Sequence, residues 1–208
     1  ELMYALVERL DPQDVFDVSR FAFVELARSG VSAVGEFHYL HHDRNGKPYK
    51  NRTELAQAVA AAAREAGLRL TLIRTAYLRG GYGQELTPAQ RRFCDGGVED
   101  VLRDVEALQR AFGDDPLTEV ALAAHSVRAV PAEALAALAG FARERGLMFH
   151  LHVAEQRREV EECLDEHGRR PVALLDELGA LDERTVAVHA THLSEDEVDA
   201  LGRARAFV

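Results

Sequence analysis

The stretch PAEALAALAGFARERGLMFHLHVAE, residues 131–155, joins a helix to a buried strand and decides the fold class. Pro131 suits the start of a helix, and the alanines and leucines after it are strong helix formers. The run LMFHLHVAE then predicts a strand in which apolar residues alternate with two histidines. An ordinary buried strand gains nothing from two histidines and a following glutamate, so the end of this strand is a candidate site.

The same alternation of helix and strand continues along the chain. Helices are predicted over residues 11–30, 51–67, 96–113, 131–146, 158–168, 170–180 and 194–204, and strands over residues 31–40, 68–78, 117–127, 147–155 and 184–193. A further strand begins at the end of the chain. Strands that alternate with helices of this length predict parallel βαβ units, and strands apolar on both faces predict a sheet covered by helices.

Parallel strands flanked by helices form either a barrel or an open, doubly wound sheet. No strand is followed by a GxGxxG turn, and the glycine-rich stretch RGGYGQ, residues 79–84, predicts a mobile loop over the site instead. We therefore predict an α/β fold of the TIM type: a partial (β/α)8 barrel that lacks the first strand and the last one or two. Residues 1–208 are expected to form a single barrel domain that is an excerpt of a longer chain.

Composition excludes several classes of partner. The formal net charge is -10, which argues against nucleic acid or an anionic membrane, and no apolar run is long enough to span a bilayer. Two cysteines do not make a disulfide framework, so they predict reduced thiols and a cytoplasmic protein. The partner we expect is a small-molecule substrate. A homodimer is compatible with the sequence, which does not decide the oligomeric state.

Polar residues that are unusual in buried strands gather where the predicted strands end. Eight of the nine histidines lie there, all except His167. The carboxyl ends of barrel strands meet at one face, and barrel enzymes carry their reactive groups on that face. Eight histidines in one layer are hard to explain by packing alone, so we predict a site at these strand ends.

His152, Glu155 and His189 are the strongest candidates in this group. Alternation places His150 and His152 on one face of their strand, and His152 lies nearer the strand end, where its imidazole suits a first-row metal. Glu155 begins the following loop and can carry a proton beside a metal-bound water. His189, at the end of the next strand, is expected to bind the metal or the attacking water. The alternative is that both histidines are core residues and Glu155 caps the next helix.

His125 and Arg128 follow the end of another predicted strand. A guanidinium at this position suits bidentate capture of a substrate carboxylate. A surface ion pair is an equally good explanation of Arg128 from its position alone. His125 is expected to donate a hydrogen bond to a polar group of the substrate.

Two pairs of segments carry a family resemblance. HLHVAEQ (150–156) with VAVHATHL (186–193) resembles the amidohydrolase superfamily, in its branch of metal-dependent deaminases. GEFHYLHHDRNGKPY (35–49) with AAHSVRAV (123–130) is more telling and is similar to the formimidoylglutamate deiminases. The resemblance runs through essentially the whole chain. It implies hydrolysis of N-formimino-L-glutamate to the formyl compound and ammonia, with one divalent metal ion, zinc first among the candidates.

The resemblance also implies a role for each matching residue. His152 matches the metal-ligand histidine of the fifth barrel strand, Glu155 the proton-shuttling glutamate, and His189 the sixth-strand histidine that contacts the hydrolytic water. The positions expected around the formimino-glutamate are Tyr39, His125 and Arg128, with Arg128 the expected partner of its carboxylate.

The sequence departs from the family pattern in its metal ligands. The paired HxH of the first barrel strand and the aspartate of the eighth strand do not occur in it. A catalytic zinc needs about three protein ligands, so we expect this chain alone to bind metal poorly and to be inactive. Two alternatives stay open: a related deaminase of an aromatic ring, of the guanine or triazine type, and a non-catalytic barrel fragment.

Overall fold

Five parallel strands form one curled sheet in the computed structural model, which describes residues 2–208. The sheet has the strand order β1-β2-β3-β4-β5, and a parallel bridge between Val186 and Phe207 begins a sixth strand. The strands are β1 (Ala33–His38), β2 (Arg69–Ala76), β3 (Thr118–Ser126), β4 (Phe149–Val153) and β5 (Thr185–His189). Because each strand neighbours the next in chain order and all run the same way, the predicted partial (β/α) barrel is confirmed.

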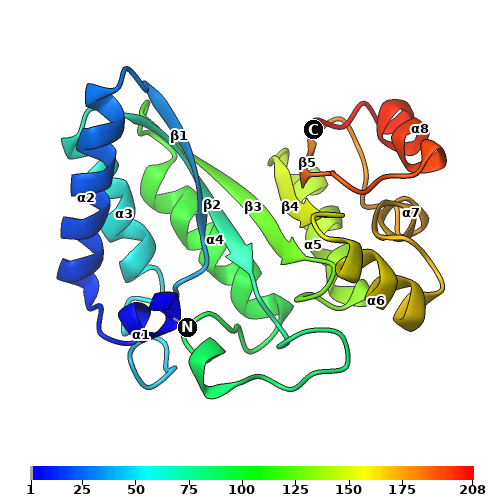
Figure 1. The fold of residues 1–208 in the computed structure, drawn as a ribbon. Helices are drawn as coiled ribbons and strands as arrows, with labels where there is room; N and C mark the ends of the chain where they lie inside the picture. The colour runs from blue at the N-terminus through cyan, green and yellow to red at the C-terminus, as the bar shows by residue number, and fades with distance from the viewer. Residues whose placement is uncertain (1) are drawn as a thin grey trace.

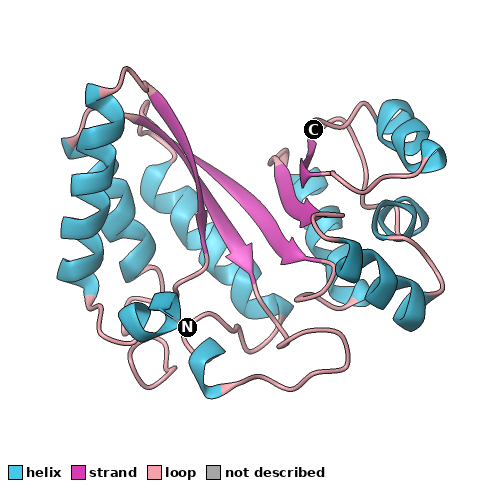
Figure 2. Ribbon diagram, in the orientation of Figure 1, coloured by secondary structure: helices cyan, strands magenta, loops and turns pink. Residues whose placement is uncertain are grey.

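Helices connect the strands and flank the sheet, with α2 and α3 beside β1 and α6, α7 and α8 beyond β4 and β5 (Figures 1 and 2). Two of them begin with capping boxes, which satisfy otherwise unpaired N–H groups: Asp11 with Asp14 before α2, and Ser194 with Glu197 before α8. The helices are α1 (Leu2–Val7), α2 (Pro12–Arg28), α3 (Glu54–Glu65), α4 (Val98–Phe112), α5 (Ala132–Arg145), α6 (Arg157–His167), α7 (Pro171–Glu177) and α8 (Glu195–Ala204).

None of the helices in residues 2–208 is both long and apolar enough to cross a membrane. Cys94 and Cys163 are both free, which agrees with the prediction that the chain has no disulfide framework.

Alternation along the strands divides the core into two faces. The face toward the helices is the larger one, and leucines such as Leu72, Leu122 and Leu151 are completely buried there. The inner face is a small cluster in which Ile73, Ala121 and Ala123 pack with Phe37 and Met148.

A buried ion network fixes β2 to α4. The guanidinium of Arg74 is almost completely buried and forms ion pairs with Asp95 and with Asp104, the latter at 2.8 Å from Nη2 to Oδ2. Arg52 contacts Asp104 from the other side, with 2.7 Å between Nε and Oδ1. Neither carboxylate has access to water as an alternative partner, so the network depends on its arginines.

Removing the Arg74 charge is expected to destabilise the fold strongly. Arg74→Met keeps much of the side-chain volume but leaves buried carboxylates short of a partner, which typically costs about 3–5 kcal/mol. Urea denaturation measures the change in the free energy of unfolding. Arg103→Met, which breaks only the exposed pair with Asp100, is the control and should cost less than about 1 kcal/mol. Equal losses in the two variants would contradict the importance of the buried network.

Candidate active site

Three histidines from neighbouring strands meet at the carboxyl end of the sheet. His125 and His152 are the second-last residues of β3 and β4, and His189 ends β5. The ring centroids of His125 and His152 are 5.2 Å apart, and those of His152 and His189 are 5.5 Å apart with an interplanar angle of 30°. The structure therefore brings these three predicted site residues together in a row across three strands.

An irregularity in β3 shapes the middle of this row. Ala124 pairs with Leu151 and Ser126 with His152, so His125 is an extra residue between two regular pairs. Such a bulge leaves one residue out of the ladder and re-aims its groups. The carbonyl oxygen of His125 is thereby free to accept a hydrogen bond from Nδ1 of His152, at 2.7 Å.

This hydrogen bond determines the tautomer of His152. A carbonyl oxygen can only accept, so the proton lies on Nδ1 and the lone pair of Nε2 stays available. Burial is the main cause that lowers the pKa of His152. Burial also lowers the pKa of His125 to about 3, with the neighbouring charges of His152 and Arg128 as smaller causes. Both imidazoles are neutral at pH 7, the form in which histidine binds a metal or donates a single hydrogen bond.

Glu155 is held in place by the backbone that follows β4. Ala154 has a positive φ of 51°, unusual for a residue with a side chain, and turns the chain sharply after the strand. The buried carboxylate of Glu159, in the first turn of α6, accepts from the backbone N of Ala154 at 2.9 Å and of Glu155 at 3.1 Å. The Glu155 side chain is directed to His189, with 3.8 Å between Oε1 and Nε2.

His189 and the residue after it have positive φ angles as well, 73° for His189 and 45° for Ala190. The sharp turn is held by a hydrogen bond from the backbone N of Ala190 to the carbonyl of Val153, at 3.0 Å. Left-handed conformations of non-glycine residues cost energy and tend to occur at functional sites. Here they bring the ends of β4 and β5 together and leave the imidazole of His189 exposed.

Aromatic side chains form the wall beside the histidines. Tyr39, just after β1, packs edge-on against His125 at 5.4 Å between ring centroids, and Tyr77 does the same from the end of β2 at 5.0 Å. Phe37 lies 4.5 Å from the ring of His152. Tyr39 is thus brought to the predicted site, at its β1 side.

Arg128 lies in the turn after β3. Its positive charge is close enough to His125 and His152 to help lower their pKa values, although burial is the larger cause for both. Within residues 2–208, no carboxylate forms an ion pair with Arg128. The surface ion pair that the sequence left open is therefore not observed. Arg128 is half-buried, and its charge acts on the buried carboxylate of Glu159, where it lowers the pKa against the larger raising effect of burial.

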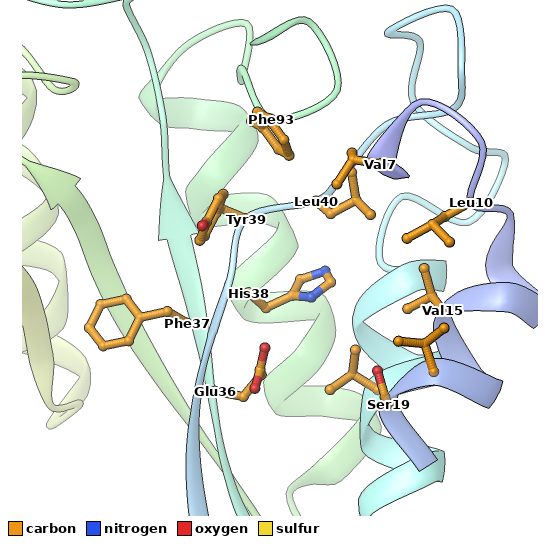
Figure 3. A pocket seen from close by; sticks show the side chains of 12 residues that line it. Val7, Leu10, Val15, Ser19, Glu36, Phe37, His38, Tyr39, Leu40 and Phe93 are labelled. Atoms are coloured by element: carbon orange, nitrogen blue, oxygen red, sulfur yellow. The ribbon is translucent and has the colours of Figure 1, made fainter. Parts of the chain in front are cut away.

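Only three of the eight predicted histidines form this row, and His38, His41 and His42 lie elsewhere, so the expectation of eight histidines in one layer is wrong. His38 is within β1 and faces the pocket between β1 and α2, together with Glu36, whereas Phe37 and Tyr39 point to the other side of the strand (Figure 3). His41 accepts from Nη1 of Arg74 at 2.6 Å, in the buried ion network. His42 contacts the carbonyl of Cys94 at 2.8 Å.

The metal-binding capacity of the site is partial. The free Nε2 of His152 fits one ligand of a divalent ion, and the tautomer is the one that a metal-binding imidazole needs. No group of three or more histidine, cysteine, aspartate or glutamate residues in the described part of the chain could hold a metal ion.

Sequence reasoning missed two groups that shape the site: the carbonyl of His125 and the carboxylate of Glu159. The bulge at His125 has no signature in the sequence. The position of Glu159 could have indicated its contact, because a glutamate in the first turn of a helix commonly accepts a hydrogen bond from the backbone N–H groups that precede the helix.

The chain is similar in sequence to curated deaminases. It is 37% identical over 209 residues to the formimidoylglutamate deiminase of Pseudomonas aeruginosa, covering 99% of this chain and 45% of that protein. It is 29% identical over 208 residues to the 5'-deoxyadenosine deaminase of Methanospirillum hungatei, covering 100% of this chain and 40% of that protein. The chain thus spans less than half the length of these curated relatives.

Two solved structures share the fold. An amidohydrolase from Brucella melitensis superposes with a TM-score of 0.90 at 35% identity, covering 98% of this chain and 45% of that one. An adenosine deaminase from Xanthomonas campestris, solved with bound zinc, has a TM-score of 0.75 at 23% identity and covers 95% and 39%. The sequence profile of the Amidohydrolase family matches residues 2–208, and this chain therefore belongs to that family.

Proposed function

We propose that the protein containing this chain hydrolyses N-formimino-L-glutamate. Water adds to the formimino carbon, the bond from that carbon to the terminal nitrogen breaks, and N-formyl-L-glutamate and ammonia are released. The observation that carries the proposal is Arg128, a half-buried cation that forms no ion pair within residues 2–208 and whose charge acts on His125 and His152. The similarity to the Pseudomonas enzyme supports the same substrate.

A divalent metal ion, most suitably zinc, completes the proposed site. Nε2 of His152 would hold it from this chain, with further ligands from outside residues 2–208. When bound, zinc is a Lewis acid that makes water acidic near neutral pH. The carbonyl of His125 contributes indirectly, since it fixes the tautomer and the direction of the His152 ring.

Glu155 is the proposed proton carrier. Its carboxylate takes a proton from the attacking water and passes it to the leaving nitrogen, which departs as ammonia. His189, 3.8 Å away, orients the same water by hydrogen bonding. Neutral His125 donates a hydrogen bond that stabilises the tetrahedral intermediate on the substrate carbon.

Arg128 and Tyr39 are proposed to bind the glutamate end of the substrate. A guanidinium matches a carboxylate with two parallel hydrogen bonds, and a half-buried position strengthens that interaction. One such cation is sufficient to select an anionic substrate, even though the chain as a whole has a net charge of -10.

A second candidate is deamination of an adenosine-type ring. Phe37, Tyr39 and Tyr77 make an aromatic wall on which a flat ring could stack, and several relatives are named as deaminases of adenosine derivatives. This function gives no role to Arg128, and we therefore place it second.

Replacement of His152 tests the metal ligand. His152→Ala should remove most of the bound zinc from the full-length protein, because zinc sites rarely tolerate loss of a protein ligand. Elemental analysis after dialysis measures the metal content. His150→Ala is the matched control, since it removes a histidine from the same face of β4 at a deeper position, and it should retain zinc. Zinc loss from both variants alike, or from neither, would rule out the assignment.

Replacement of Glu155 tests the proton carrier. Glu155→Gln keeps the shape but cannot carry the proton, so kcat should fall about 10²- to 10⁴-fold with the metal content unchanged. The control is Glu161→Gln on the exposed surface of α6, which should have wild-type kcat. Activity retained by Glu155→Gln would refute the role.

Replacement of Arg128 tests the substrate class. Arg128→Gln should raise KM for N-formimino-L-glutamate about 30- to 100-fold, because a charge-assisted pair with the carboxylate is lost. Hydrolysis of formamidine, which has no carboxylate, should be affected less than about twofold. Steady-state kinetics with both compounds measures this difference. An equal rise in KM for both would argue against a pair between Arg128 and the substrate carboxylate, and would favour deamination of an adenosine-type ring.

A further inference from the structure

The turn that carries Arg128 is a single tight turn after β3. The backbone N–H groups of Ala129 and Val130 both donate to the carbonyl of Ser126, each at 3.1 Å. The carbonyls of Val127, Arg128 and Ala129 accept no hydrogen bond from within this turn. Val127, Ala129 and Val130 are buried, so these carbonyls need donors from elsewhere in the protein.

The segment after β2 supplies all of these donors. The backbone N–H groups of Leu78 and Arg79 donate to the carbonyl of Ala129, at 2.9 and 3.0 Å. The Arg79 side chain donates to the other two carbonyls: its Nε to the carbonyl oxygen of Arg128 at 2.8 Å and its Nη2 to that of Val127 at 3.2 Å. One guanidinium therefore bridges two consecutive carbonyls beneath the Arg128 side chain.

The Arg79 guanidinium is itself fixed from two further sides. Its Nη1 forms an ion pair with Oε1 of Glu166 on α6, at 2.7 Å. Its Cζ lies 5.1 Å from the ring centroid of Tyr82, in the glycine-rich segment. Two carbonyls, a carboxylate and an aromatic ring thus define both the position and the plane of the group. Glu166 also neutralises its charge, whereas Arg128 forms no ion pair within residues 2–208.

We propose that Arg79 is a positioning residue that holds the turn after β3 so that Arg128 meets the carboxylate of the substrate. Arg79 itself touches neither the substrate nor the reacting atoms. The inference rests on the proposed function, because it assigns Arg128 to substrate binding. A lysine at position 79 could replace the charge but not the planar fork that spans both carbonyls.

Kinetics of the full-length protein test the inference. Arg79→Ala should raise KM for N-formimino-L-glutamate about tenfold, with kcat within about twofold of wild type and unchanged zinc content. Arg79→Lys should recover only part of the loss. Arg143→Ala is the matched control: Arg143 also bridges a carboxylate, Asp182, and a carbonyl, Gly179, but it lies at the end of α5, before β4. Its KM should be that of wild type.

A double-mutant cycle separates positioning from general loss of structure. If Arg79 acts through Arg128, the KM of the Arg79→Ala, Arg128→Gln double variant should equal that of Arg128→Gln alone. If the rises in KM of the two single variants multiplied in the double variant, the proposal would be overturned. A fall in kcat and zinc content of Arg79→Ala with no change in KM would overturn it as well.

Amide hydrogen exchange gives a readout that does not depend on the substrate. Arg79→Ala should speed exchange in a peptide spanning residues 125–131, with Arg143→Ala unchanged there. Unchanged exchange in Arg79→Ala would refute the proposal that Arg79 holds the turn after β3. If the wild-type protein leaves N-formimino-L-glutamate intact, the proposed function and the substrate part of this inference both fail. Faster exchange would then still support Arg79 as the residue that holds the turn.

Discussion

The hydrogen bond from Nδ1 of His152 to the carbonyl oxygen of His125 connects the fold to the chemistry. It exists because β3 has one residue more than its partner strand at that point, which frees a carbonyl from the ladder. The bond fixes the tautomer of His152 and leaves the lone pair of its Nε2 available. If the strands paired regularly, the same two histidines would be neighbours without a defined direction for either ring.

The rest of the site depends on backbone geometry held by buried polar groups. Glu159 secures the turn that carries Glu155, and Arg79 secures the turn that carries Arg128. The two arrangements share one principle. In each, a charged side chain satisfies backbone groups that would otherwise lack hydrogen-bond partners. Glu155 and Arg128, the residues proposed to face the substrate, do not take part in these backbone hydrogen bonds through their side chains. In the proposed function, Glu155 exchanges a proton with water and the leaving nitrogen, and Arg128 binds and releases the carboxylate of the substrate.

The sequence predicted the fold and the row of site residues because both follow from local periodicity. Alternation along residues 147–155 placed His152 on the inner face, and the position of Glu155 just beyond the strand followed directly. Local patterns could not show which face His38 would take, since both sides of β1 are partly covered, nor where His41 would lie in the loop after β1. The bulge at His125 and the contacts of Arg74 with Asp95 and Asp104 depend on residues far apart in the sequence, and these were not foreseen.

Nuclear magnetic resonance of the imidazole nitrogens determines the tautomer of His152. In metal-free, full-length protein labelled with ¹⁵N-histidine, and with the His152 signals assigned by comparison with His152→Gln, Nδ1 should be protonated and Nε2 unprotonated at pH 7. Added zinc should then shift the Nε2 signal and leave the proton on Nδ1. A proton found on Nε2 of His152 would contradict a hydrogen bond from Nδ1 to the carbonyl of His125, and Nε2 would then not be available to a metal.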